Sequence, residues 1–119
     1  MTDEPAPELS AEDAKLVTLA RATRARINAA EGAAVRDTDG RTYAAATVDL
    51  ASLHVSALQV CVAMALSSGS RGLEAAVLLT QADGFSDADR AAIREFGGGD
   101  VVLHRGDWRG QIGISATAG

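Results

Sequence analysis

Residues 85–103, FSDADRAAIREFGGGDVVL, carry the signals that begin a helix, end it and then begin a strand. Ser86 is a residue type that caps helix N-termini, and Asp89 three residues later completes a capping box. The glycines at 97–99 end the helix, and the apolar residues that follow predict a strand. The stretch is therefore typical of a helix that leads into a strand of an α/β sheet.

The chain before this stretch predicts a helix, a hairpin, a second helix and a strand. Ser10 and Asp13 form another helix start, and Asp-Gly at 39–40 predicts a hairpin turn between two short apolar runs. Residues 50–68 are apolar on nearly every side and predict a buried helix that ends at Gly69, and residues 73–80 predict a buried strand. One stripe of the first helix holds Leu16, Leu19, Ala20, Thr23, Ile27 and Ala30, while Arg21, Arg24 and Arg26 lie off it and are expected to face solvent.

The segment after residue 100 predicts two more strands, at 100–104 and 111–115, separated by a turn at 106–110. The full order is therefore α-β-β-α-β-α-β-β. This order predicts an α/β fold, a three-layer α/β/α sandwich with a mixed sheet. We expect one domain over residues 10–115, a disordered tail over 1–9 and a short tail over 116–119.

Composition excludes several classes of function. The net charge of −5 argues against binding to a nucleic-acid backbone but leaves a basic protein partner open. Cys61 is the only cysteine, so an intrachain disulfide is excluded, and its apolar surroundings predict a buried, inert thiol. No apolar run reaches membrane-spanning length, and the acidic N-terminus does not resemble a secretory signal. The expected compartment is the cytoplasm.

Three segments resemble the cytidine deaminase family. KLVTLARATRARINA at 15–29 is similar to the family's first helix, VRDTDGRTYAAATVDLAS at 35–52 to its hairpin, and ADRAAIREFG at 88–97 to its segment ACRQVLAEFG. The resemblance covers residues 15–115 and implies a cytidine deaminase-like fold. In that family a Cys/His-Ala-Glu motif and a Pro-Cys-x-x-Cys motif hold zinc, which activates a water, while the glutamate moves protons at C4 of cytosine.

The motif positions in this sequence hold other residues. Phe85 stands in place of the proline, and Ser86 and Asp89 stand in place of the two cysteines, whereas Arg90 and the Glu-Phe-Gly at 95–97 are retained. The first motif can be matched to residues 56–58, 54–56 or 58–60. None of the three registers supplies the glutamate.

Other polar residues have alternative interpretations. Matching residues 54–56 would retain His54 as a ligand, although a lone histidine is more often structural. A zinc site formed by His54, His104 and Asp89 is conceivable, but these residues do not have the close spacing in sequence that is typical of zinc ligands. The family's ribose-binding Asn-x-Glu aligns with Thr47 and Asp49, of which Asp49 could still accept a ribose hydroxyl. His104 is expected at the rim of a strand. Trp108 either covers the sheet edge or anchors a partner.

These observations predict a catalytically degenerate cytidine deaminase-like protein without zinc or another cofactor. Its expected role is that of an oligomeric scaffold or binding module, with a further protein partner left open. The apolar segment 50–68 predicts a homo-oligomer, either a dimer or a tetramer. The alternatives are an active cytidine deaminase, supported by the resemblance alone, and a metal-free nucleoside sensor that uses Asp49.

Overall fold

A computed structural model describes residues 8–119, so most of the predicted tail over 1–9 lies outside the described residues. Five strands form one mixed sheet in the order β2-β1-β5-β6-β7, in which β5 and β6 are parallel and the other pairs are antiparallel. The strands of this sheet are β1 (Gly32–Asp37), β2 (Thr42–Ala46), β5 (Leu73–Leu79), β6 (Val102–Gly106) and β7 (Ile112–Thr117). The helices are α1 (Ala11–Ile27), α2 (Ala57–Ser67) and α3 (Asp87–Gly97).

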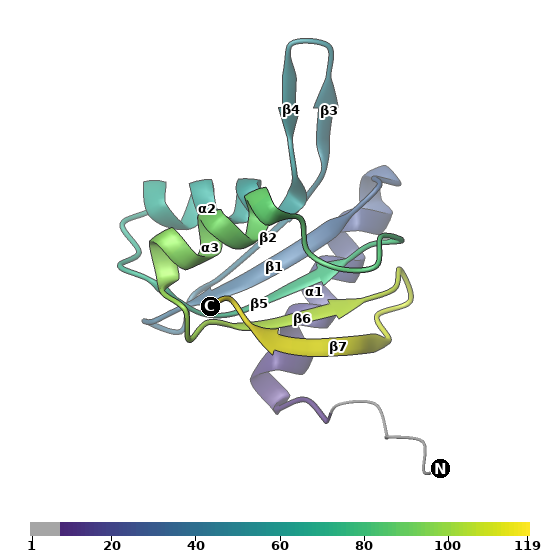
Figure 1. The fold of residues 1–119 in the computed structure, drawn as a ribbon. Coiled ribbons are helices and arrows are strands. Elements are labelled where there is room, and N and C mark those ends of the chain that lie inside the picture. The colour runs from purple at the N-terminus through teal and green to yellow at the C-terminus, as the bar shows by residue number, and fades with distance from the viewer. Residues whose placement is uncertain (1–7) are drawn as a thin grey trace.

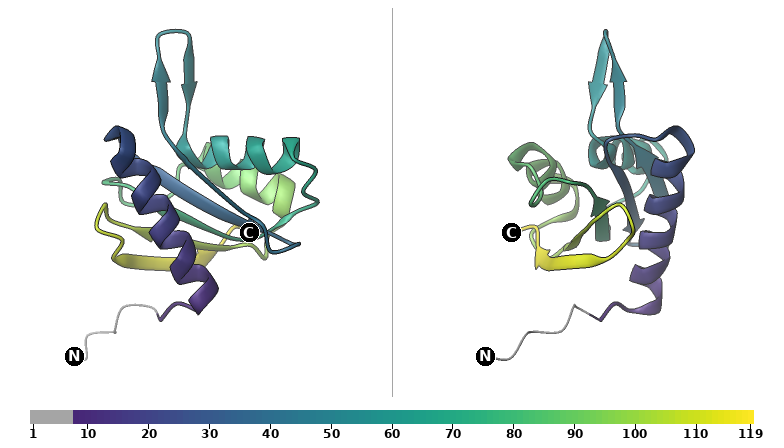
Figure 2. Two further views of the ribbon diagram at one scale, coloured as in Figure 1. Left: turned by 180° about the vertical axis from the view of Figure 1, so that it is seen from behind. Right: turned by 90° about the vertical axis from the view of Figure 1, so that its right-hand side faces the viewer.

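Helices cover both faces of the sheet. Figures 1 and 2 show α1 on one face and α2 with α3 on the other. Alternate residues of the central strands supply the two cores: Val35, Leu78 and Leu103 face α2 and α3, while Val77 and Leu79 face α1. The predicted three-layer α/β/α sandwich with a mixed sheet is confirmed.

The predicted helix over 50–68 is wrong in its first part. Val48–Leu50 (β3) and Leu53–Val55 (β4) pair as an antiparallel hairpin that projects from the body of the molecule (Figure 1). The helix begins at Ala57 because Ser56 and Gln59 form a capping box: the Ser56 hydroxyl accepts from the Gln59 N–H, and the Gln59 side chain accepts from the Ser56 N–H. This local signal outweighs the continuous apolar character of the segment.

The solvent-facing position predicted for Arg24 is also wrong. Leu16, Ala20 and Arg24 form the buried face of α1, whereas Leu19 and Ile27 of the predicted stripe are exposed. The Arg24 guanidinium lies 3.5 Å from the centre of the Trp108 ring, and the Trp108 Nε1–H donates to the carbonyl of Ala30. Trp108 therefore packs within its own chain and closes the C-terminal end of α1.

Close packing of α1 on the sheet requires a glycine at the start of β1. A Cβ added to Gly32 would lie 2.4 Å from the carbonyl oxygen of Ala20 and 2.6 Å from Cβ of Arg24. Any larger residue at this position would therefore push α1 away from β1. None of the helices described over residues 8–119 is both long enough and apolar enough to cross a membrane.

Candidate functional site

The N-termini of α2 and α3 meet, and each begins at a serine cap. Ser56 caps α2 and Ser86 caps α3. The Ser56 hydroxyl donates to Oδ1 of Asp89 at 2.6 Å, and the Asp89 N–H donates to the Ser86 hydroxyl at 3.1 Å. The structure thus brings Ser86 and Asp89, which stand in place of the two cysteines, together with Ser56, the ligand position in one of the three registers of the first motif.

Asp89 is the central group of this site, and its side chain is buried, with the residue only 3% exposed. It lies in the first turn of α3, where the helix dipole favours a negative charge. The Ser56 hydroxyl provides a hydrogen bond from the neighbouring helix. Asp89 therefore joins the two helix N-termini through hydrogen bonds of its side chain and its N–H group.

The side chains at this site are not the ligands that a zinc ion requires. Structural and catalytic zinc sites use thiolates, imidazoles and carboxylates, whereas this site offers one carboxylate and two hydroxyls that already cap helices. Among residues 8–119 no group of three or more histidine, cysteine, aspartate or glutamate residues is placed to hold a metal ion. The chemistry available here is hydrogen bonding between the two helices.

The contact with Asp89 also bears on the three possible registers of the first motif. It places Ser56 at the start of α2 opposite the second motif. In that register Leu58 takes the position of the glutamate, and its side chain is fully buried in the core. Leu58 has no group that can accept or donate a proton.

His54 is not brought to this site. It lies on the projecting hairpin, where its Nδ1 is 2.9 Å from Oδ1 of Asp49, and both side chains are mostly exposed. Asp49, the residue aligned with the ribose carboxylate, is thus paired across the hairpin. The hypothetical site of His54, His104 and Asp89 is not formed, because His104 contacts α1 on the opposite face of the sheet from α3.

Thr47, the other residue aligned with ribose binding, is engaged within the chain. Its hydroxyl accepts from the Glu31 N–H at 2.9 Å and donates to the Glu31 carbonyl at 3.3 Å. The Glu31 carboxylate in turn accepts from the Thr80 hydroxyl at 2.7 Å. These bonds join the short loop before β1 to the end of β5, a contact that no local motif predicts.

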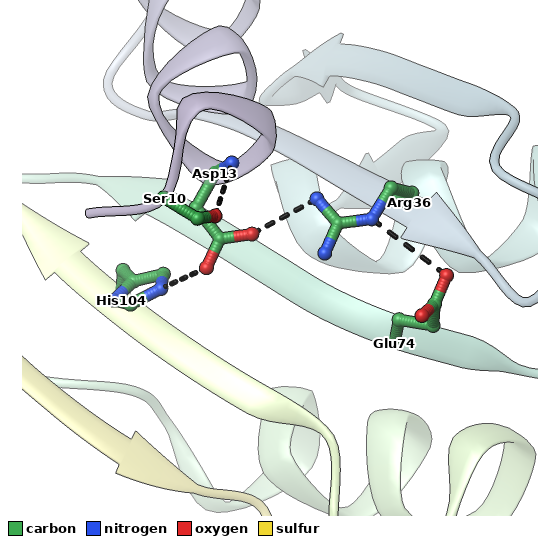
Figure 3. Close-up of polar contacts among 5 residues, drawn as sticks. All are labelled: Ser10, Asp13, Arg36, Glu74 and His104. Atoms are coloured by element: carbon green, nitrogen blue, oxygen red, sulfur yellow. Dashed lines mark hydrogen bonds and ion pairs between the residues drawn. The ribbon is translucent and has the colours of Figure 1, made fainter.

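A second polar cluster lies on the α1 face and includes His104, whose predicted rim position is wrong. His104 is only 5% exposed, and its Nε2 lies 2.8 Å from Oδ2 of Asp13. Arg36 donates to the other carboxylate oxygen of Asp13 at 2.9 Å and also contacts Glu74 (Figure 3). Burial opposes ionisation of Asp13, but hydrogen bonds and charge from His104 and Arg36 outweigh it and lower the pKa of this carboxyl.

Cys61 has the environment expected of an inert thiol. It lies on the buried face of α2, and burial raises the pKa of the thiol to about 12. Because the thiolate is the reactive form, this cysteine is a poor nucleophile at neutral pH.

Comparison with known proteins agrees with this arrangement of elements. Residues 9–110 match the family described as Cytidine deaminase-like. The sequence matches none of the curated proteins with which it was compared.

Among solved structures, cytidine deaminase from Burkholderia pseudomallei superposes with a TM-score of 0.78 at 21% identity, covering 93% of this chain and 94% of that one. Cytidine deaminase from Mycobacterium leprae gives 0.71 at 20% identity, with 92% and 95% covered. The enzyme from Bacillus anthracis gives 0.66 at 14% identity, with 92% and 84% covered. At these identities the likeness establishes the fold.

Proposed function

Because this chain belongs to the cytidine deaminase-like family, we propose that it is a member that keeps the fold without the chemistry and acts as a non-catalytic, oligomeric scaffold or binding module. The observation that carries this proposal is the hydrogen bond between Ser56 and Asp89. It occupies, with groups that bind zinc poorly, the meeting point of two helices at which the resemblance places the metal.

Hydrolytic deamination needs an activated water and a proton carrier beside C4 of the base. Zinc lowers the pKa of a bound water to about 7, and a positioned acid or base contributes roughly 10²- to 10⁴-fold in rate. Leu58 supplies neither group, and Asp89 is committed to its hydrogen bond with Ser56. The proposal therefore assigns no catalytic residue and no zinc to this site.

The second part of the proposal is that copies of this chain associate through the surface of residues 50–68. Residues 50–70 contain no aspartate, glutamate, lysine or arginine, although 23% of the chain is charged. Leu50, Leu53 and Leu66 on this surface are 61%, 50% and 59% exposed. A two-stranded hairpin is marginally stable by itself, so the projecting β3–β4 hairpin benefits from a covering partner.

A second copy of the chain is the occupant that this surface suits. Each molecule carries a net charge of −5, so two copies repel one another. Contact through a surface without charged residues meets the least of this repulsion. The same chain offers both a projecting apolar hairpin tip and a shallow groove of about 330 Å³ between α2 and α3. The groove is lined by Val62, Leu66, Ala92, Glu95 and Phe96. A two-fold dimer, or a tetramer built from it, would bury both features.

Neither alternative function is favoured by a specific contact. A nucleoside sensor would need Thr47 and Asp49 free, yet Thr47 binds Glu31 and Asp49 pairs with His54. An active deaminase rests on the likeness of fold alone, which does not establish function. The cytoplasmic location stays a prediction, because a single cysteine cannot form an intrachain disulfide in any compartment.

Elemental analysis of the purified protein, together with a calorimetric titration with cytidine, tests the site. We expect far less than one zinc per chain and no heat of cytidine binding. One tightly held zinc per chain would overturn the metal-free site. Cytidine binding without zinc would instead support the sensor.

A further inference from the structure

A line of hydrogen bonds on the α1 face ends at an exposed hydroxyl. Asp13 Oδ2 lies 2.8 Å from His104 Nε2, and His104 Nδ1 lies 2.6 Å from the hydroxyl oxygen of Ser115. Figure 3 shows Asp13 held between His104 and Arg36. The order carboxylate, imidazole, serine is that of groups that activate a serine for nucleophilic attack.

The backbone of the sheet builds this arrangement. His104 on β6 and Ser115 on β7 are paired directly across the antiparallel ladder, so their side chains lie on the same face. His104 is nearly fully buried, whereas Ser115 lies exposed on the edge strand. The histidine is therefore fixed in position, and its serine partner remains accessible to a reagent from solvent.

The partners of His104 also decide where its proton lies. The lowered pKa of Asp13 keeps that carboxylate ionised at neutral pH, so it can only accept a hydrogen bond. In the neutral imidazole the proton must then be on Nε2, which leaves Nδ1 as the acceptor for the Ser115 O–H. The charged groups near these hydrogen bonds are Asp13 and Arg36, with Glu74 in contact with Arg36.

We propose that Ser115 is a reactive serine that accepts an acyl group from a small, activated acyl donor such as a thioester or aryl ester. This activity is independent of the proposed function, because Ser56 and Asp89 belong to the first turns of α2 and α3, which cover the opposite face of the sheet (Figure 2). Ser115 lies on an open edge strand, so the donor is selected by its reactivity more than by its shape.

The step balances as an acyl transfer. The Ser115 oxygen forms a bond to the donor's carbonyl carbon while its proton passes to Nδ1 of His104. The donor's C–S or C–O bond then breaks, and His104 returns the proton to the departing thiolate or phenoxide. The products are acyl-Ser115 and a free thiol or phenol, with no oxidant or reductant required. Asp13 acts as a positioning residue that fixes the tautomer of His104.

The experiment treats the full chain with p-nitrophenyl acetate and maps the acetyl group by peptide mass spectrometry. We expect acetylation of Ser115 to be roughly 10²- to 10⁴-fold faster than that of Ser86, the range contributed by a positioned base. Ser86 is the internal control, because it is an exposed serine outside the surface of residues 50–68 and has no histidine partner among residues 8–119. Equal rates at the two serines, or no acetylation of Ser115, would overturn the proposal.

Variants separate activation from simple exposure. Ser115→Ala should remove the fast acetylation and leave that of Ser86 unchanged. Asp13→Asn should slow acetylation of Ser115 by about 100-fold or more, because the amide no longer holds the proton on Nε2. Nitrogen-15 chemical shifts of His104 should report the same change of tautomer. An Asp13→Asn variant with the altered tautomer but an unchanged rate of Ser115 acetylation would contradict the proposed activation of Ser115 by His104.

Discussion

The hydroxyl of Ser56 and the carboxylate of Asp89 are joined by a hydrogen bond of 2.6 Å that links the first turns of α2 and α3. The two residues are 33 positions apart in sequence. Their contact connects the two helices that cover one face of the sheet, so it has a direct consequence for stability.

Replacing Ser56 by alanine should destabilise the protein by about 1–3 kcal/mol, since it removes a helix cap and leaves a buried carboxylate without its partner. Asp89→Ala should have an effect of similar size. Urea unfolding followed by the fluorescence of Trp108, the single tryptophan, measures both.

The control for these variants is Thr18→Ala on the exposed side of α1, outside the surface of residues 50–68, for which we expect a change within about 0.7 kcal/mol. Equal stability of wild type, Ser56→Ala and Asp89→Ala would contradict a linking role for the contact.

The same positions should accept a metal once they carry thiols. The triple variant Ser56→Cys, Ser86→Cys, Asp89→Cys places cysteines at two helix N-termini, where the dipole favours thiolates. We expect it to bind one Co²⁺ per chain with thiolate charge-transfer absorption, and to remain inactive toward cytidine until Leu58→Glu is added. A folded triple variant that binds no metal would argue against this placement of the motifs, as would one that turns over cytidine with Leu58 in place.

Acid should weaken the fold partly through Asp37, a fully buried carboxylate at the end of β1. Burial raises its pKa, but hydrogen bonds from Ser70 and from the N–H groups of Arg41 and Asp39 outweigh this, so the net pKa is lowered. A carboxyl whose pKa is lower in the folded protein than in the unfolded protein stabilises the fold. This contribution is complete above the unfolded-state pKa of about 3.9 and is lost as the pH falls through the folded-state pKa.

Asp37→Asn tests this linkage, because the amide oxygen can still accept from Arg41 and Asp39. The free energy of unfolding of the variant should be about 1.5–3 kcal/mol lower than that of wild type at pH 7. This difference should become smaller as the pH falls below about 4. Stability is measured by urea unfolding at each pH. A gap that stays constant from pH 7 to pH 2 would show that Asp37 does not contribute through its charge.

If copies associate through the surface of residues 50–68, lysine substitutions on this surface should weaken association, whereas a lysine elsewhere should not. Leu53→Lys and Leu66→Lys should each raise the dissociation constant by roughly 100-fold, if these leucines contribute about 2–3 kcal/mol as buried interface residues. Ile27→Lys is the control, because Ile27 is a comparably exposed apolar residue, 62% exposed, on α1. Multi-angle light scattering at micromolar concentration should show oligomers for wild type and this control only. A monomeric wild type would refute the interface.

Most of the fold could be predicted from local signals. The serine caps at Ser10 and Ser86 and the turn that ends at Gly40 fixed the elements around them, because each depends on residues close in sequence. The β3–β4 hairpin was missed because an apolar run of this length has the same composition in a helix as in paired strands. The Ser56 and Gln59 capping box was the available signal for the true helix start.

The polar contacts were harder to predict because they join distant segments. His104 pairs with Asp13, 91 residues away, and Thr80 pairs with Glu31, 49 residues away. The burial of Arg24 depends on Trp108, which comes from the turn between the last two strands. Periodicity along one helix does not contain this information, since a long polar side chain can pack against an aromatic ring.

A direct assay for conversion of cytidine to uridine shows whether the protein keeps the fold without deaminase chemistry. Purified wild-type protein at micromolar concentration would be incubated with cytidine, with zinc supplied, and uridine would be quantified by liquid chromatography. We expect no uridine above the level of the protein-free control. Uridine formation that increases in proportion to protein concentration would contradict it.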